Sequence, residues 1–146
     1  MATGSGIVRT ARVSWLTHPP RGHAHVAVGG RAFTHLPLSY RGEDVEAETT
    51  TPGELLTAAH CSALALILSR VLERDRTPAR ELTVAGAYTF AGDWYEIVAV
   101  EFTIRGRVEE VDGARFAQAT REAVDLCSKS LGLPGGGAVA LDAKLA

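Results

Sequence analysis

One long apolar segment, residues 51–68, limits what this chain can fold into. The segment opens as a helix does, because Thr51 can cap the free N–H groups, Pro52 takes the first helical position, and Glu54 completes a T-x-x-E capping box. From Leu55 to Leu68 the apolar residues go round every side of the predicted helix instead of forming one stripe. We therefore expect a central helix that other elements bury on all sides.

Length and charge define the class of protein. A chain of 146 residues with 15 basic and 17 acidic residues and a net charge of -2 predicts one domain, residues 1–146, with no broad basic surface for nucleic acid or an anionic membrane. The apolar run is interrupted by His60 and Ser62 and ends at Arg70, which predicts that it is too short and too polar to span a bilayer. No apolar export segment is recognisable at the N-terminus, so a cytoplasmic location is expected.

The remaining periodicity predicts two groups of strands and a second helix. Strands and hairpins are indicated by alternating apolar residues and glycine turns, and the second helix by three- and four-residue steps that put Cys127 on its buried stripe. The predicted order β-β-β-α-β-β-α-β comprises strands Ile7–Trp15, His23–Val28 and Arg31–Leu36, a helix from Pro52 to about Arg74, strands Glu81–Phe90 and Tyr95–Val108, a helix capped by Asp112 and ended by Gly132, and a strand over Val139–Leu145. This order predicts an α+β fold with antiparallel sheets, and a homodimer would help to cover the central helix.

The two cysteines are the residues that suggest chemistry. In a cytoplasmic protein they are either inert buried thiols or a redox pair. Cys61 lies inside the central helix, and a guanidinium from Arg41 on the preceding loop could lower its pKa and hold an oxygen of a bound peroxide. Glu54 could orient that guanidinium. The alternative is that Cys61 is a small core residue, Arg41 a solvated cation and Glu54 only the capping-box acid, and spacing by itself favours this alternative.

No metal or cofactor is expected. His23 and His25 are two apart on a strand and point the same way, but a third ligand is missing. The glycines at 135–137 are followed neither by a helix nor by a Lys-Ser/Thr pair, so they do not form a phosphate loop. His60 is expected to pack near the polar seam of the helix rather than to act as a base.

Three segments together resemble the OsmC/Ohr family of osmotically induced and organic-hydroperoxide-resistance proteins. They are residues 51–60, 127–131 and the closing strand 141–145, and the resemblance extends over nearly the whole chain. It implies an intertwined α+β homodimer with active sites at the subunit interface. It also implies a peroxidase in which a cysteine of the central helix attacks an organic hydroperoxide, a second cysteine closes a disulfide, and a dithiol, often lipoyl-bearing, reduces it.

Some of the family's site residues have a counterpart in this chain and others do not. Cys127 stands at the resolving position, although Ser128 replaces the usual proline, and Arg41 resembles the active-site arginine of the osmotically induced branch. At the helix start Gly53 replaces the acid next to proline, which leaves Glu54. The family's reactive cysteine normally comes three residues after the position of His60, where this chain has Ala63.

Cys61 lies two residues before that position, which turns a helix by about 200°. If the register matches the family, Cys61 points nearly opposite to the usual nucleophile, whereas a local slip would bring it into the site. Two functions therefore stay open. The first is a thiol peroxidase for organic hydroperoxides with Cys61 as nucleophile, Cys127 resolving, and Arg41 and Glu54 activating. The second is a family fold that has lost this chemistry and binds a small ligand in an apolar pocket at the dimer interface.

Overall fold

The computed structural model describes residues 6–16, 23–39, 48–92, 96–133 and 139–146. The chain divides into two compact units, residues 1–54 and 55–146, which are described separately. The α+β class and the order β-β-β-α-β-β-α-β predicted from the sequence are confirmed, with three strands in each of two sheets.

The first unit is a three-stranded antiparallel sheet. Its strands are β1 (Ala11–Leu16), β2 (His23–Val28) and β3 (Leu36–Leu38), paired in the order β1-β2-β3. The first strand starts later than predicted, and the third begins where the predicted one ended. The late start of the third strand has a local reason. Arg31 has a φ of 61° and donates its N–H to the Val28 carbonyl at 3.0 Å. A positive φ cannot continue an extended strand, so the Gly29-Gly30 turn leads into a loop.

The central helix α1 runs over Pro52–Arg74, as predicted. Its capping box is formed, because the Glu54 N–H donates to the Thr51 hydroxyl at 3.1 Å and that hydroxyl donates to a Glu54 carboxylate oxygen at 3.3 Å. The helix therefore begins where its sequence places the start.

The second unit contains a longer sheet, built from β4 (Ala79–Ala91), β5 (Glu96–Val108) and β6 (Val139–Leu145) in that order. Strands β4 and β5 form an antiparallel hairpin, whereas β6 pairs with β5 in parallel. The prediction of purely antiparallel sheets was thus wrong for β6. A helix, α2 (Gly113–Leu131), connects β5 to β6, and such a crossover returns the chain in the same direction.

The ends of α2 follow from two residues that the sequence singled out. The Asp112 side chain accepts the Arg115 N–H at 2.8 Å, which caps the helix N-terminus. Gly132 adopts the left-handed conformation with a φ of 68°, which ends the helix. Pro134 and the glycines at 135–137 lie outside the described residues.

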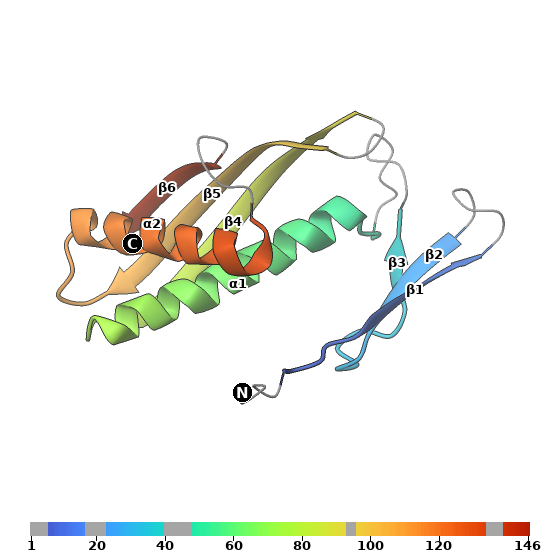
Figure 1. Ribbon diagram of the computed structural model, residues 1–146, viewed down its shortest axis with the longest axis horizontal. Helices are drawn as coiled ribbons and strands as arrows, with labels where there is room; N and C mark the ends of the chain where they lie inside the picture. The colour runs from blue at the N-terminus through green and yellow to red at the C-terminus, as the bar shows by residue number, and fades with distance from the viewer. Residues whose placement is uncertain (1–5, 17–22, 40–47, 93–95, 134–138) are drawn as a thin grey trace, which may run out of the picture. The chain divides into compact units, whose positions relative to one another are not determined.

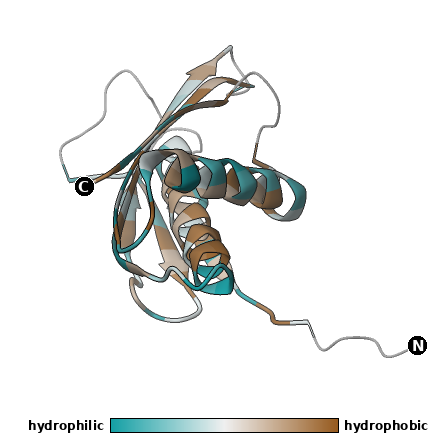
Figure 2. Ribbon diagram, turned by 90° about the vertical axis from the view of Figure 1, so that its left-hand side faces the viewer, coloured by the Kyte–Doolittle hydropathy of each residue, from teal (hydrophilic) through white to brown (hydrophobic). Residues whose placement is uncertain are grey.

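Both helices lie on the same face of the β4-β5-β6 sheet (Figures 1 and 2). The core between them is apolar and continuous, and its fully buried side chains include Leu64, Leu68, Phe102, Ile104 and Phe116. At their far ends the helices are joined by exposed ion pairs: Arg74 holds both Glu122 oxygens at 2.6 and 2.9 Å, and Arg115 contacts Asp75 at 2.9 Å.

Helix α1 is covered on one side only within the described residues. Its buried positions form a single stripe, His60, Leu64, Leu68, Val71 and Leu72. On other sides Leu56 is 38% and Leu66 53% exposed. A single chain therefore does not cover these residues, and burial of α1 on all sides stays a prediction that depends on a second subunit.

The bilayer argument from the sequence also needs correction. Helix α1 is long and apolar enough, by length and composition, to cross a membrane, so it is not too short or too polar to do so. A core helix meets the same criterion. In α1 28% of the apolar window is buried, and this buried stripe belongs to the same core as β5 and α2.

A close approach between α2 and the sheet generates a stability prediction. A Cβ on Gly106 of β5 would lie 2.7 and 2.8 Å from ring atoms of Phe116, whose side chain is fully buried. Gly106→Ala should therefore lower the free energy of unfolding by about 1–3 kcal/mol, since the ring has no free space to enter. Urea denaturation measures this loss. Gly113→Ala is the matched control, because a Cβ there meets nothing within 4 Å, and an equal loss in both variants would contradict the packing argument.

Candidate functional site

The Cys61 thiol rests on the backbone of β4. A Cβ on Gly86 would lie 2.7 Å from Cys61 Sγ, 3.2 Å from Thr57 Cγ2 and 3.3 Å from Phe102 Cε1. Glycine at position 86 therefore makes the space into which the thiol fits. Cys61 is half-buried, and this burial raises the pKa of its thiol.

The second thiol comes from α2. Cys127 is 0% exposed and belongs to the same core cluster as Phe116, Ala119 and Ala123, which confirms its predicted place on the buried stripe. Burial raises the pKa of this thiol as well. Both cysteines are free thiols.

Two hydrogen bonds of the His60 ring connect α1 with β4 and with the end of α2. His60 of α1 shares a hydrogen bond of 2.6 Å with the Tyr88 hydroxyl of β4 through Nδ1, and its Nε2 lies 3.2 Å from the Leu131 carbonyl oxygen at the end of α2. A carbonyl only accepts, so Nε2 carries a proton. In the neutral ring Nδ1 is then the acceptor, and the Tyr88 hydroxyl donates to it.

Tyr88 belongs to the same core as the two thiols. It is two residues after Gly86 on β4, so both face the same side of the sheet, where the Cys61 thiol rests. Leu131 lies one helical turn after Cys127, so its contact with His60 brings that turn of α2 to the same place. The Tyr88 hydroxyl interacts electrostatically with both thiols, and its burial together with this interaction raises its pKa well above the usual range.

The structure thus brings four groups together, Cys61, Cys127, His60 and Tyr88. The other two predicted site residues are placed differently. Arg41 lies outside the described residues, and Glu54 is described as the capping-box acid of α1. The predicted pairing of Arg41 with Glu54, and the activating role of both, stay predictions.

The register question concerns the buried stripe of α1. Cys61 and Ala63 are both half-buried and both pack against the core. With about 100° per residue, they flank the stripe through His60 and Leu64 on opposite sides. The core-facing half of the helix therefore accommodates the thiol at position 61 without any irregularity.

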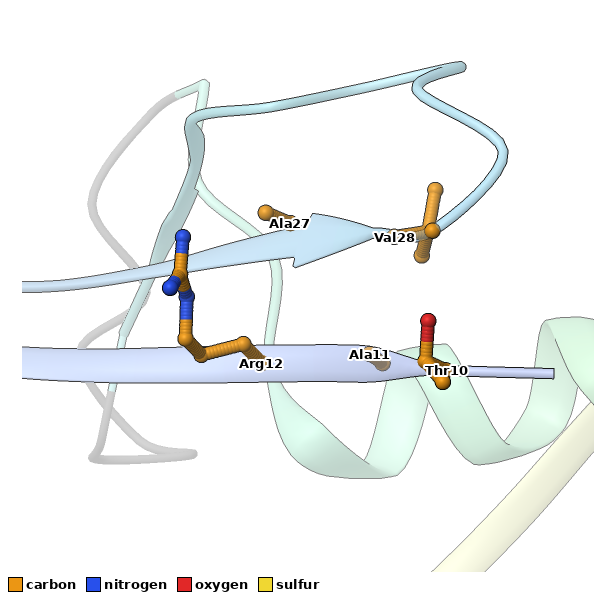
Figure 3. Close-up of a pocket in the computed structure, with 6 residues that line it drawn as sticks. Thr10, Ala11, Arg12, Ala27 and Val28 are labelled. Atoms are coloured by element: carbon orange, nitrogen blue, oxygen red, sulfur yellow. The ribbon is translucent and has the colours of Figure 1, made fainter.

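The histidine pair weighed as a metal site, His23 and His25, lies in the first unit. The ring of His25 stacks on that of His35, with centroids 3.9 Å apart and an interplanar angle of 26°. No group of three or more His, Cys, Asp or Glu residues that could hold a metal ion occurs in the described ranges. An open pocket of about 260 Å³ lies at the end of the β1-β2 hairpin and contains none of the predicted site residues; it is lined by Thr10, Ala11, Arg12, Ala27, Val28 and Gly29 (Figure 3).

Sequence reasoning missed Tyr88, and it placed His60 near a polar seam of the helix, whereas the structure buries it on the core-facing stripe. The signal for Tyr88 was the alternation of β4, which places it on the same face as Leu82, Val84 and Gly86. A tyrosine on a core-facing strand position needs a partner for its hydroxyl. The only hint of that partner was the polar residue His60 within the apolar run.

Comparisons with known proteins identify the fold. No protein-family model matches this chain, and no curated protein sequence matches it. Solved structures do match over nearly the full length. An organic hydroperoxide resistance protein OsmC from Legionella pneumophila superposes with a TM-score of 0.68 at 13% identity, covering 97% of this chain and 98% of its own.

Two further structures show the same agreement. An organic hydroperoxide resistance protein from Elizabethkingia anophelis gives a TM-score of 0.68 at 13% identity and covers 98% of each chain. An OsmC-like protein of unknown function from Vibrio cholerae gives 0.70 at 11% identity, covering 97% of this chain and all of that one. At these identities the likeness shows the fold, so the protein has the OsmC/Ohr-like fold and its structural neighbours are members of that family.

The different burial of the two thiols predicts their reactivity. Iodoacetamide should modify Cys61 well before Cys127, because Cys127 is fully buried. Burial favours the neutral thiol, so the rate at Cys61 should rise with pH through a midpoint above that of free cysteine. Mass spectrometry of peptides after timed alkylation measures both effects, and urea-unfolded protein, in which both sites should react alike, is the control. A midpoint below that of free cysteine would show that a cation outside the described residues activates the thiol.

Proposed function

We propose that this protein is a thiol-dependent peroxidase that reduces organic hydroperoxides in oxidative stress defence, with Cys61 as nucleophile and Cys127 as resolving cysteine. The observation that carries the proposal is the presence of both thiols, one from each helix, in a single core. The printed names of the Legionella pneumophila and Elizabethkingia anophelis neighbours, organic hydroperoxide resistance proteins, support the choice of substrate.

The proposed reaction has three steps. The Cys61 thiolate attacks the outer oxygen of the hydroperoxide, which breaks the O–O bond, forms a sulfenic acid and releases the alcohol after one proton is taken up. The Cys127 thiol then attacks the Cys61 sulfur, closing a disulfide and releasing water. An external dithiol, which we expect to be lipoyl-bearing, reduces the disulfide and is itself oxidised.

Activation requires partners for the thiolate. We assign this role to Arg41, whose guanidinium can hold a peroxide oxygen, with Glu54 to orient it. We also propose an intertwined homodimer, because a second subunit would cover the exposed Leu56 and Leu66 of α1 and could complete the site. Two free thiols in a working redox pair fit a cytoplasmic protein, and no membrane partner is proposed.

One observation favours a second candidate function. Burial raises the pKa of both thiols, which opposes formation of a nucleophilic thiolate, and no described side chain lowers the pKa of Cys61. Ala63 also stands at the family's usual nucleophile position. The alternative is therefore a protein that keeps the fold without the peroxidase reaction and binds a small ligand in an apolar pocket at the dimer interface.

Intact-protein mass spectrometry separates the two functions. The reduced protein, mixed with one equivalent of cumene hydroperoxide under non-reducing conditions, should rapidly lose two hydrogens and give a peptide with a Cys61–Cys127 disulfide. Slow oxidation scattered over other residues, or no change, would support the ligand-binding alternative.

The variant Cys127→Ser sharpens this test. Without a resolving thiol, Cys61 should stop as a sulfenic acid that dimedone traps, and turnover with a dithiol such as dihydrolipoamide should fall by about a hundredfold, the low end of what a positioned catalytic group supplies. Unchanged turnover would mean that Cys127 is only a packing residue.

A further inference from the structure

The last turn of α2, which follows Cys127, is tied to the neighbouring helix by a side chain. Its residues Lys129, Ser130 and Leu131 are all exposed, so they add no buried apolar surface. The carbonyl groups of the last four residues of a helix have no partner within that helix. For Leu131 the partner comes from α1, because His60 Nε2–H donates to the Leu131 carbonyl oxygen at 3.2 Å. A directional polar contact therefore holds this turn.

The donor itself is fixed in place. The His60 side chain is buried, and its second ring nitrogen, Nδ1, accepts the Tyr88 hydroxyl of β4 at 2.6 Å. Turning the ring away would leave buried polar atoms without partners, which costs free energy. We call the imidazole with these two hydrogen bonds the His60 clamp. It joins α1, β4 and the end of α2 within one compact unit.

The His60 clamp lies next to both thiols along the chain. Cys61 is the following residue of α1, and its thiol rests on Gly86, two residues before Tyr88 in β4. Cys127 comes one helical turn before Leu131 in α2. The clamp thus fixes the turn that carries one thiol relative to the turn that carries the other.

We propose that His60 is a positioning residue for the closure of the Cys61–Cys127 disulfide. This inference rests on the proposed function, in which the two thiols are a redox pair. By holding the end of α2 against α1, the clamp limits the space that Cys127 can explore relative to Cys61. That restriction raises the effective concentration of one thiol at the other. His60 acts through the helix, and it neither gives nor takes a proton in this step.

An apolar residue at position 60 would fill the same space without this effect. Contacts between apolar side chains have no direction, so they allow an exposed helix turn to shift or fray. A buried polar group with all its partners selects one arrangement of the elements that it joins. The polar residue inside the apolar run of α1 therefore specifies where α2 ends relative to Cys61.

The test measures the effective concentration of the two thiols without any peroxide. Reduced protein is equilibrated with mixtures of glutathione and glutathione disulfide. The glutathione disulfide accepts two electrons and two protons from the thiols of Cys61 and Cys127, which form a disulfide, and gives two glutathione molecules. Acid quenching, alkylation and mass spectrometry give the fraction of protein with the disulfide, and its dependence on the glutathione ratio gives the effective concentration.

Two changes at position 60 are compared with the wild-type protein. His60→Phe keeps a ring and removes both hydrogen bonds, so the effective concentration should fall about tenfold, the equivalent of one net hydrogen bond. His60→Gln keeps an N–H that can donate to the Leu131 carbonyl, so it should stay close to the wild-type value. A clamp that only adds stability would lower the urea midpoint of His60→Phe and leave the effective concentration unchanged.

The matched control is Thr120→Val. It removes a fully buried hydroxyl that donates to the Phe116 carbonyl at 3.0 Å, a hydrogen bond that lies within α2 and joins no two elements. This variant should lose stability in urea without a change in effective concentration. If His60→Phe does not fold, Tyr88→Phe replaces it, because it leaves the imidazole with one partner and should change the effective concentration in the same direction.

Equal effective concentrations in the wild-type protein and His60→Phe overturn the inference, as does an equal fall in His60→Gln and His60→Phe. The proposed function fails separately. If cumene hydroperoxide forms no disulfide in the wild-type protein while the glutathione titration shows the loss in His60→Phe, the peroxidase function falls and the positioning role stands. A wild-type protein that forms no disulfide at any glutathione ratio overturns both.

Discussion

The central helix needs more apolar cover than its own sheet provides, and this imbalance shapes the rest of the structure. The sheet of β4, β5 and β6 and the parallel helix crossover of α2 bury one stripe of α1, from His60 to Leu72. Burial of that stripe stabilises this unit by about 25 cal/mol per Å² of apolar surface removed from water. The opposite half, with Leu56 and Leu66, keeps its exposure in the described chain. The proposed second subunit answers that remaining need.

Two glycines let this packing be close. Gly106 lies under the Phe116 ring and Gly86 under the Cys61 thiol, so the sheet approaches α2 at one point and α1 at the other. Neither glycine is needed for an unusual backbone conformation, because both lie within regular strands. Their value is the absence of a side chain. The same feature that allows the core to close therefore decides where the thiol sits.

Within that core the buried polar side chains are few, and each is hydrogen-bonded. His60 is hydrogen-bonded at both ring nitrogens, and the buried Thr120 hydroxyl bonds to the helix turn before it. The exposed ion pairs of Arg74 and Arg115 act at the other end of the helices, where solvent screens them and their contribution to stability is small. The hydrogen bonds of His60 to Tyr88 and Leu131 thus connect α1 with β4 and with the end of α2 inside the described core.

The sequence by itself determined the elements, because their signals are local. The capping residues Thr51 and Asp112, the left-handed Gly132 and the alternation along β6 each act through neighbours in the chain, and the predicted helices and most strands were confirmed. The prediction missed one local feature, the positive φ of Arg31, which ends an extended run.

Only the tertiary structure decided what the elements place together. The parallel direction of β6 and the one-sided cover of α1 depend on contacts between elements far apart in the chain. His60 likewise meets Tyr88 and Leu131, which lie 28 and 71 positions further along. Periodicity says which face of a strand or helix is buried, but it does not say which partner is opposite. That choice is made by close packing, where the absence of a Cβ at Gly86 matters as much as the presence of a thiol at Cys61.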